Sequence, residues 1–110
     1  DLKVLTVTKN MHERKKIMYD KSDAFIVLPG GVGTLDEFFE TLTWAQLGLH
    51  DKPIILLNID NFWTPLLNLL NHQVKSGFIN KNINKLFITL KTSQKAIDYL
   101  LDSNRQLSPE

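Results

Sequence analysis

The chain contains a glycine-rich turn between an apolar segment and a helix start, and this feature constrains its fold most. The stretch reads Asp23-Ala-Phe-Ile-Val-Leu-Pro-Gly-Gly-Val-Gly-Thr-Leu-Asp-Glu37. Residues 24–28 are apolar throughout, which is typical of a strand that is covered on both faces of a sheet. Pro29 ends this strand because it has no N–H to donate to the ladder. A buried strand that opens directly onto a helix is the unit from which parallel α/β sheets are built.

The turn itself predicts an anion site. Gly30, Gly31 and Gly33 leave bare backbone N–H groups beside a helix N-terminus, a place where proteins often bind phosphate. Thr34 is a good N-cap residue, and Glu37 three positions later completes a capping-box pattern. The spacing matches neither Gly-x-Gly-x-x-Gly nor Gly-x-x-x-x-Gly-Lys-Ser/Thr, so a tight strand-to-helix connection without a ligand is the alternative. For Glu37 the alternative is a purely structural capping partner.

The rest of the chain alternates between strand-like and helix-like segments. Strands are expected at 2–7, 24–28, 54–58 and 86–90, and helices at 11–20, 35–47, 62–75 and 93–101. This alternation predicts a parallel sheet with right-handed crossovers. Gly48 and Gly77 should stop two of the helices, Ser93 should cap the last one, and 80–84 reads as a polar loop. The expected core residues of the two middle helices are Phe38, Leu42, Ala45 and Leu49, and Phe62, Leu66, Leu69, Leu70 and Val74.

Ligands of such sheets bind beyond the carboxyl ends of the strands. The glycine turn lies at one such end, and the segment after Val7, which carries Met11 to Lys15, lies at another. If the two strands are neighbours, Arg14 faces the same crevice as the glycine turn. By itself, Arg14 would be read as a solvated arginine on a helix.

Composition narrows the range of partners and of metal or disulfide sites that the chain could have. Thirteen Lys and Arg against twelve Asp and Glu leave a net charge of +1, so neither nucleic acid nor an anionic membrane is an expected partner. The absence of cysteine excludes disulfides and thiolate metal sites and fits a reducing cytoplasm. The three histidines (His12, His50 and His72) lack metal-ligand spacing, so no metal is expected, and His50 is expected to bond carbonyls at a helix end.

The expected organisation is one domain over 1–102 and a polar tail over 103–110. The chain opens at Asp1 directly with a strand-like segment. We therefore expect it to be the carboxy-terminal part of a longer domain whose amino-terminal portion precedes it.

Two motifs together resemble a known family. Met11-His-Glu-Arg-Lys15 and Pro29-Gly-Gly-Val-Gly-Thr-Leu-Asp-Glu37 resemble the Met-His-x-Arg-Lys and Pro-Gly-Gly-x-Gly-Thr-x-x-Glu signatures of the LONELY GUY family. These are cytokinin riboside 5′-monophosphate phosphoribohydrolases that were long labelled putative lysine decarboxylases. The similarity continues through 43–53 and 77–79 and covers roughly residues 2–101.

The resemblance implies a Rossmann-like homodimer that hydrolyses the N-glycosidic bond of a nucleoside 5′-monophosphate without a cofactor. It implies that Arg14 and Glu37 are catalytic, and that Arg14, Lys15, Gly30, Gly31, Gly33 and Thr34 bind the phosphate and substrate. A carboxylate in this role stabilises an oxocarbenium-like ribose or activates water. The amino-terminal half of the family's domain, which supplies part of the crevice, is not in this sequence.

Two other classes of function compete with the enzyme. A non-catalytic nucleotide or cofactor carrier would need the glycines but not Glu37, and a partner-binding fragment would need neither. A lysine decarboxylase would need a lysine suited to a pyridoxal phosphate Schiff base, and no lysine has such a context. Finally, Trp44 and Leu47 lie off the core stripe of their helix, so they either join the core or form an interface, and an interface is the favoured reading. The family resemblance implies that the partner is a second copy of the chain, so we expect a homodimer built through the helix of Thr43, Trp44 and Leu47.

Overall fold

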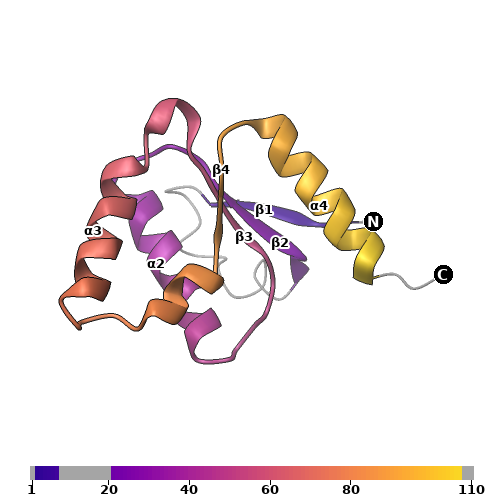
Figure 1. Cartoon of the computed structure of the whole chain (residues 1–110). Helices are drawn as coiled ribbons and strands as arrows, with labels where there is room; N and C mark the ends of the chain where they lie inside the picture. Colours follow the sequence, from indigo (N-terminus) through magenta and orange to yellow (C-terminus); the bar gives the residue numbers. More distant parts are fainter. Residues whose placement is uncertain (1, 8–20, 108–110) are drawn as a thin grey trace.

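The computed structural model describes residues 2–7 and 21–107, with side chains described as far as residue 102. Its centre is a parallel four-stranded sheet whose strands follow one another in chain order (Figure 1). The strands are β1 (Val4–Val7), β2 (Ala24–Val27), β3 (Ile54–Leu57) and β4 (Ile88–Leu90). The predicted α/β fold with a Rossmann-like parallel sheet is confirmed. The helix expected over 11–20 lies outside the described residues.

Helices cover both faces of this sheet. Helices α2 (Val32–Gln46) and α3 (Thr64–Lys75) lie on one face, and α4 (Ser93–Leu107) lies on the other (Figure 1). Two short 3₁₀ turns, η1 (Ile59–Asn61) and η2 (Lys81–Lys85), complete the connections. No helix in the described part of the chain has both the length and the hydropathy of a bilayer-spanning segment.

The strands alternate their side chains between two cores, as the two-residue period of a strand requires. The core under α2 and α3 includes side chains from three strands, and the core under α4 takes the residues in between. The first contains Leu5, Val7, Phe25, Val27, Ile54 and Leu56, and the second contains Ala24, Ile55, Leu57, Ala96 and Leu100.

Glycines end α2 and α3 as expected. Gly48 and Gly77 have φ values of +75° and +83°, in the left-handed region that glycine adopts without strain. The N–H of Leu49 donates to the carbonyl of Trp44, and the N–H of Phe78 donates to that of Gln73, each at 2.9 Å. Both helices therefore end in a Schellman motif that satisfies their last carbonyls.

Three expected core residues are in fact exposed. Leu49 is 67% exposed because α2 ends at Gln46 and the left-handed Gly48 turns the chain away from the helical stripe. Phe62 precedes α3, and Trp63 fills the core position in its place. Leu69 is half exposed because the inner stripe of α3 runs through Leu66, Leu67, Leu70 and Val74.

Several expected boundaries also shift. Thr92, not Ser93, caps α4, because its hydroxyl accepts the N–H of Lys95 at 3.1 Å. The helix continues to Leu107, past its expected end at Leu101. The expected polar loop over 80–84 contains most of η2, which buries Ile83 in the core.

Asn58 joins the end of β3 to the start of α3 and to β4. Its backbone N–H donates to the carbonyl of Leu90 at 2.7 Å. Its buried amide accepts the N–H of Trp63 at 2.6 Å and donates to the hydroxyl of Thr64 at 3.2 Å. These bonds hold the turn through Asp60 and Asn61, which both have positive φ, at the carboxyl end of β3.

Candidate active site

The glycine turn connects β2 to α2 at the carboxyl end of the strand. The helix begins at Val32, and Gly31 is its N-cap residue, since the carbonyl of Gly31 accepts the N–H of Leu35 at 3.1 Å. No side chain of the described residues caps this helix end. The first backbone N–H groups of a helix have no partner within the helix, and here they lie in a turn of small residues.

The predicted N-cap role of Thr34 is wrong, and so is the capping box. Thr34 lies within the first turn of α2, three residues after the observed N-cap, and its side chain is buried. Its hydroxyl occupies the space that a Cβ on Gly30 would need. Thr34 therefore packs under the turn, and the capping role expected for Glu37 disappears with it.

An uncapped helix start favours an anion. The helix dipole places partial positive charge at this end, and α2 has no acidic residue in its first turn to neutralise it. Gly31 and Val32 are exposed, so a ligand can approach the turn. The described part of the turn therefore has the chemistry expected for phosphate.

Glu37 lies on the inner side of α2, and its side chain is only 3% exposed. It follows the N-cap residue by six positions, which corresponds to roughly 9 Å along the helix axis. Burial of a carboxylate costs free energy unless polar groups surround it, so glutamate side chains are seldom buried in proteins. A buried glutamate therefore indicates a specific role and not a solubilising one. The structure thus places a buried acid and a candidate phosphate turn on the same helix.

The two strands that were expected to frame the crevice are neighbours. β1 and β2 pair in parallel with Val7 opposite Val27, so the segment after Val7 leaves from the same edge of the sheet as the glycine turn. Arg14 and Lys15 belong to that segment, and both lie outside the described residues. Their expected place in the crevice stays a prediction.

His50 was expected to bond carbonyls at the end of α2. Its Nε2 instead lies 3.0 Å from the carbonyl oxygen of Thr41, which belongs to the interior of α2 and not to its last turn. Among the described residues, no group of three or more His, Cys, Asp and Glu side chains could hold a metal ion.

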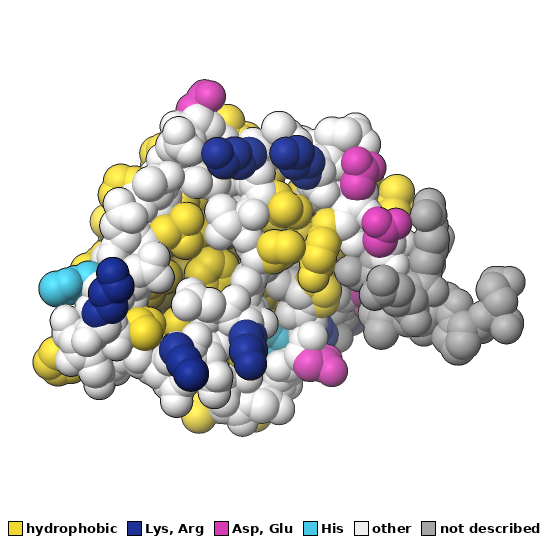
Figure 2. All heavy atoms as spheres, viewed as in Figure 1, with side chains coloured by type: hydrophobic (Ala, Val, Ile, Leu, Met, Phe, Trp, Pro, Cys, Tyr) yellow, Lys and Arg dark blue, Asp and Glu magenta, His cyan; other side chains and the backbone are white. Residues whose placement is uncertain are grey.

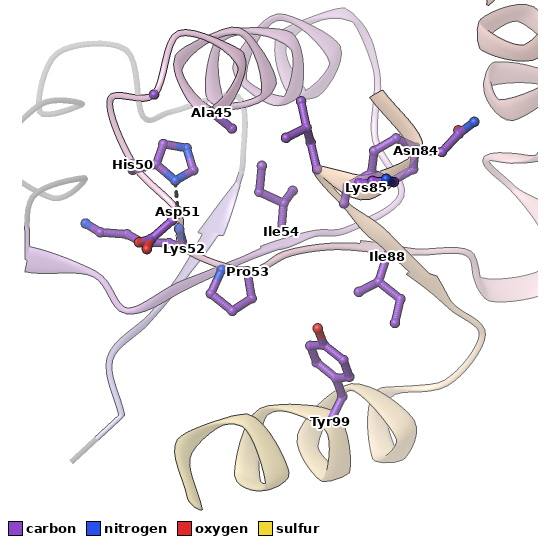
Figure 3. Close-up of a pocket in the computed structure, with 13 residues that line it drawn as sticks. Ala45, His50, Asp51, Lys52, Pro53, Ile54, Asn84, Lys85, Ile88 and Tyr99 are labelled. Carbon is purple, nitrogen blue, oxygen red and sulfur yellow. Dashed lines mark hydrogen bonds between the residues drawn. The ribbon is translucent and has the colours of Figure 1, made fainter. Parts of the chain in front are cut away.

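A cavity lies at the opposite end of the sheet. It has a volume of about 810 Å³ and is lined by the segments that precede β3 and β4, by the end of α2 and by Tyr99 of α4 (Figure 3). Its floor is apolar (Pro53, Ile54 and Ile88). Its charged and polar side chains include the exposed Asp51, Asn84 and Lys85 and the partly buried His50 and Lys52. Figure 2 shows apolar side chains at the centre of one face of the molecule, with charged side chains around them.

We assign the candidate active site to the glycine turn and not to this cavity. Open parallel sheets bind ligands at the carboxyl ends of their strands, whereas the cavity lies at the amino ends of β3 and β4. The lining of the cavity also lacks a buried acid, while the helix that starts at the turn carries the buried Glu37.

The outer surface of α2 carries part of the expected dimer face. Leu47 is 68% exposed and Thr43 is exposed as well. Trp44 is only partly exposed and packs against the core under α2. The two residues therefore do not form one separate apolar face, and Leu47 contributes most of its exposed apolar area.

Thr41 was not identified from the sequence as a residue of this site. It is buried, and its hydroxyl donates to the backbone carbonyl of Glu37 at 2.8 Å. The signal was available, since a threonine four residues after a candidate catalytic glutamate lies on the same side of a helix.

Known proteins match most of the chain. The family model described as "Possible lysine decarboxylase" matches residues 1–100. The chain is 47% identical over 91 residues to the cytokinin riboside 5′-monophosphate phosphoribohydrolase LOG4 of Arabidopsis thaliana, covering 83% of this chain and 42% of that protein. It is 48% identical over 93 residues to the cytokinin riboside 5′-monophosphate phosphoribohydrolase of Rhodococcoides fascians, covering 84% of this chain and 47% of that protein.

A third relative is the enzyme LOG of Oryza sativa subsp. japonica, which carries the same activity in its name. It is 47% identical over 87 residues, which are 79% of this chain and 36% of that protein. The chain thus spans less than half the length of each of these relatives. The family match extends over nearly the whole chain and includes the glycine turn and Glu37. The chain therefore belongs to the LONELY GUY family, whose family model is described as "Possible lysine decarboxylase".

Proposed function

We propose that the complete protein hydrolyses the N-glycosidic bond of a purine, cytokinin-type nucleoside 5′-monophosphate to the free base and ribose 5-phosphate. The observation that carries this proposal is the buried carboxylate of Glu37 on a helix that begins at a glycine turn, which no described side chain caps. The names of the relatives from Arabidopsis thaliana, Rhodococcoides fascians and Oryza sativa describe the same activity.

The turn anchors the substrate in this proposal. The N–H groups around Gly30, Gly31, Gly33 and Thr34 bind the 5′-phosphate, supported by the positive end of the α2 dipole. Arg14 and Lys15 contribute cationic side chains from the segment after β1, and the planar guanidinium of Arg14 orients the phosphate or ribose. Binding energy from the phosphate is then available to position the distant glycosidic bond.

Glu37 acts at the reacting carbon. Cleavage of the bond between C1′ and the base nitrogen builds positive charge on the ribose, and a nearby carboxylate stabilises that charge. The oxygen of a water molecule then adds to C1′. Glu37 takes one proton from this water and gives it up to the departing base nitrogen, directly or through solvent. The products are then neutral base and ribose 5-phosphate, and Glu37 is ionised again.

The described part of the chain does not suit the decarboxylase chemistry in the description of its family model. A pyridoxal phosphate enzyme binds its cofactor through a lysine held within the site. The described lysines are exposed apart from the half-buried Lys52, whose ammonium lies 5.9 Å from the centre of the Phe25 ring, away from the glycine turn. We therefore propose a reaction that uses no cofactor.

We further propose that the protein is a cytoplasmic homodimer. The exposed Leu47, together with Thr43 and the outer edge of Trp44, supports an interface along the end of α2. The absence of cysteine from these 110 residues suits a reducing compartment.

The decisive experiment compares AMP with adenosine as substrates of the complete protein, with release of adenine measured by chromatography. We expect kcat/KM for AMP to exceed that for adenosine by at least about a hundredfold, equivalent to ~3 kcal/mol of phosphate binding energy. Equal turnover of both would refute the phosphate-anchored mechanism. Tight binding of AMP without release of adenine would identify a non-catalytic carrier.

A further inference from the structure

His50 has both ring nitrogens in hydrogen bonds, and this defines its tautomer. The backbone N–H of Lys52 donates to Nδ1 at 3.0 Å, so Nδ1 is an acceptor. The proton of the neutral ring therefore sits on Nε2, which donates to the carbonyl of Thr41 across 3.0 Å. The ring thus bridges the loop before β3 to the interior of α2.

The same ring also contacts β2. Its centroid lies 5.4 Å from that of Phe25, with the two planes inclined at 65°, an edge-on arrangement that aromatic pairs prefer. Phe25 is fully buried in the strand that leads into the glycine turn. His50 therefore touches both the strand that ends at the candidate phosphate site and the helix that carries Glu37.

Thr41 extends this connection by one helical turn. Its carbonyl accepts from His50, and its hydroxyl donates to the carbonyl of Glu37 at 2.8 Å. Thr41 is 2% exposed, and its hydroxyl bond to Glu37 is buried away from water, while the bond from His50 is partly buried. Two consecutive hydrogen bonds thus link the imidazole to the turn of α2 that contains the candidate catalytic acid.

We propose that His50 and Thr41 are positioning residues that set where the carboxylate of Glu37 lies relative to the glycine turn. This inference rests on the proposed hydrolysis. The phosphate site belongs to the end of β2 and the start of α2, whereas Glu37 lies almost two helical turns further along. A small rotation or shift of α2 on the sheet would change their separation, and a misplacement of about 1 Å costs an enzyme up to roughly a hundredfold in rate.

The chain offers a matched pair of threonines for the test. Thr43 makes the same bond as Thr41, from its hydroxyl to the carbonyl four residues earlier (Phe39, 2.7 Å), but on the exposed side of α2. Thr41→Val and Thr43→Val each remove one hydroxyl and keep the side-chain shape. We expect kcat with AMP to fall at least about tenfold further in Thr41→Val than in Thr43→Val, with KM within about twofold between them.

A conservative variant separates positioning from packing. Thr41→Ser keeps the hydroxyl and loses a buried methyl group, so it should lose thermal stability yet retain kcat within about threefold of wild type. His50→Phe keeps a ring against Phe25 and removes both nitrogens, so it should lower kcat as Thr41→Val does. Equal kcat values in Thr41→Val and Thr43→Val, or a kcat in Thr41→Ser as low as in Thr41→Val, would overturn the proposal.

Crystal structures of the same variants keep this test independent of the reaction. If wild-type protein releases no adenine, the proposed function fails, but the position of the Glu37 carboxylate relative to Gly31 is still measurable. Displacement in Thr41→Val and His50→Phe but not in Thr43→Val would support the positioning role. An unmoved Glu37 carboxylate in all three variants would refute it.

Discussion

Gly30 and Thr34 lie so close together that any side chain on Gly30 would collide with the hydroxyl of Thr34 and stand 3.0 Å from its Cβ. The neighbouring Gly31 has nothing within 4 Å of the place where its Cβ would lie. Two adjacent glycines of one motif therefore serve different purposes. Gly30 permits the turn to fold onto the buried Thr34, whereas Gly31 leaves open space at the start of α2.

The first prediction separates these two purposes. Gly30→Ala should lower the free energy of unfolding by about 1–3 kcal/mol, because the methyl group overpacks the turn against Thr34. Gly31→Ala is the matched control and should cost less than about 1 kcal/mol, the difference between Gly and Ala at an N-cap. Urea unfolding measures both values.

A double-mutant cycle tests the cause. In a Gly30→Ala background, Thr34→Ala removes the hydroxyl that the new methyl group strikes, so the two changes should together cost less than the sum of their separate effects. Strictly additive effects, or a Gly30→Ala protein as stable as Gly31→Ala, would show that the collision is not what limits this position.

The second prediction concerns the acid. Glu37→Gln should lower kcat with AMP by about a hundredfold or more, because glutamine keeps the shape of the side chain but can neither accept a proton nor carry charge. Glu40→Gln, one turn further along α2 and partly exposed, should retain most of the activity. Comparable kcat values in the two variants, with both folds intact by circular dichroism, would return Glu37 to a structural role.

The third prediction concerns assembly. Leu47→Asp should weaken the proposed dimer by at least about tenfold in Kd, because a leucine buried on association contributes about 1.5–3 kcal/mol. Leu69→Asp is the control, since Leu69 is a half-exposed leucine on α3. Sedimentation of the complete protein at micromolar concentration measures the dimer Kd of both variants. Trp44→Ala is a less clean probe because Trp44 also packs against the core. A wild type that sediments as a monomer would exclude the dimer.

The fourth prediction concerns the turn after β3. Asp60 and Asn61 have φ values of 52° and 59°, a region that side chains with a Cβ rarely adopt. Asn61→Gly should be more stable than Asn61→Ala by about 1 kcal/mol, because glycine has no Cβ to strain and alanine lacks the side-chain amide that helps asparagine tolerate this region. Thermal unfolding of the two variants gives the difference, and equal midpoints would contradict it.

The sequence by itself determined the architecture of the described chain. Short apolar runs such as 54–57 are strands because only a sheet covered on both faces buries every residue of such a run. Gly48 and Gly77 were identifiable as helix stops because a left-handed residue after a helix has a strong local preference for glycine. The segment Met11–Lys15 and the glycine-turn segment Pro29–Glu37 together also identified the family, since each combines characteristic residues at a fixed spacing.

Only the tertiary structure decided which residue caps α2 and which side chains enter the core. Thr34 has the local chemistry of an N-cap, but packing against Gly30 draws it inward, and the helix starts at Val32 instead. Helical periodicity placed Leu49 and Phe62 in the core, yet both lie just beyond a helix end, where the period no longer applies. The contacts from His50 to Thr41 and Phe25 join residues nine and twenty-five positions apart, and they form only when the sheet brings β2, α2 and the loop before β3 together.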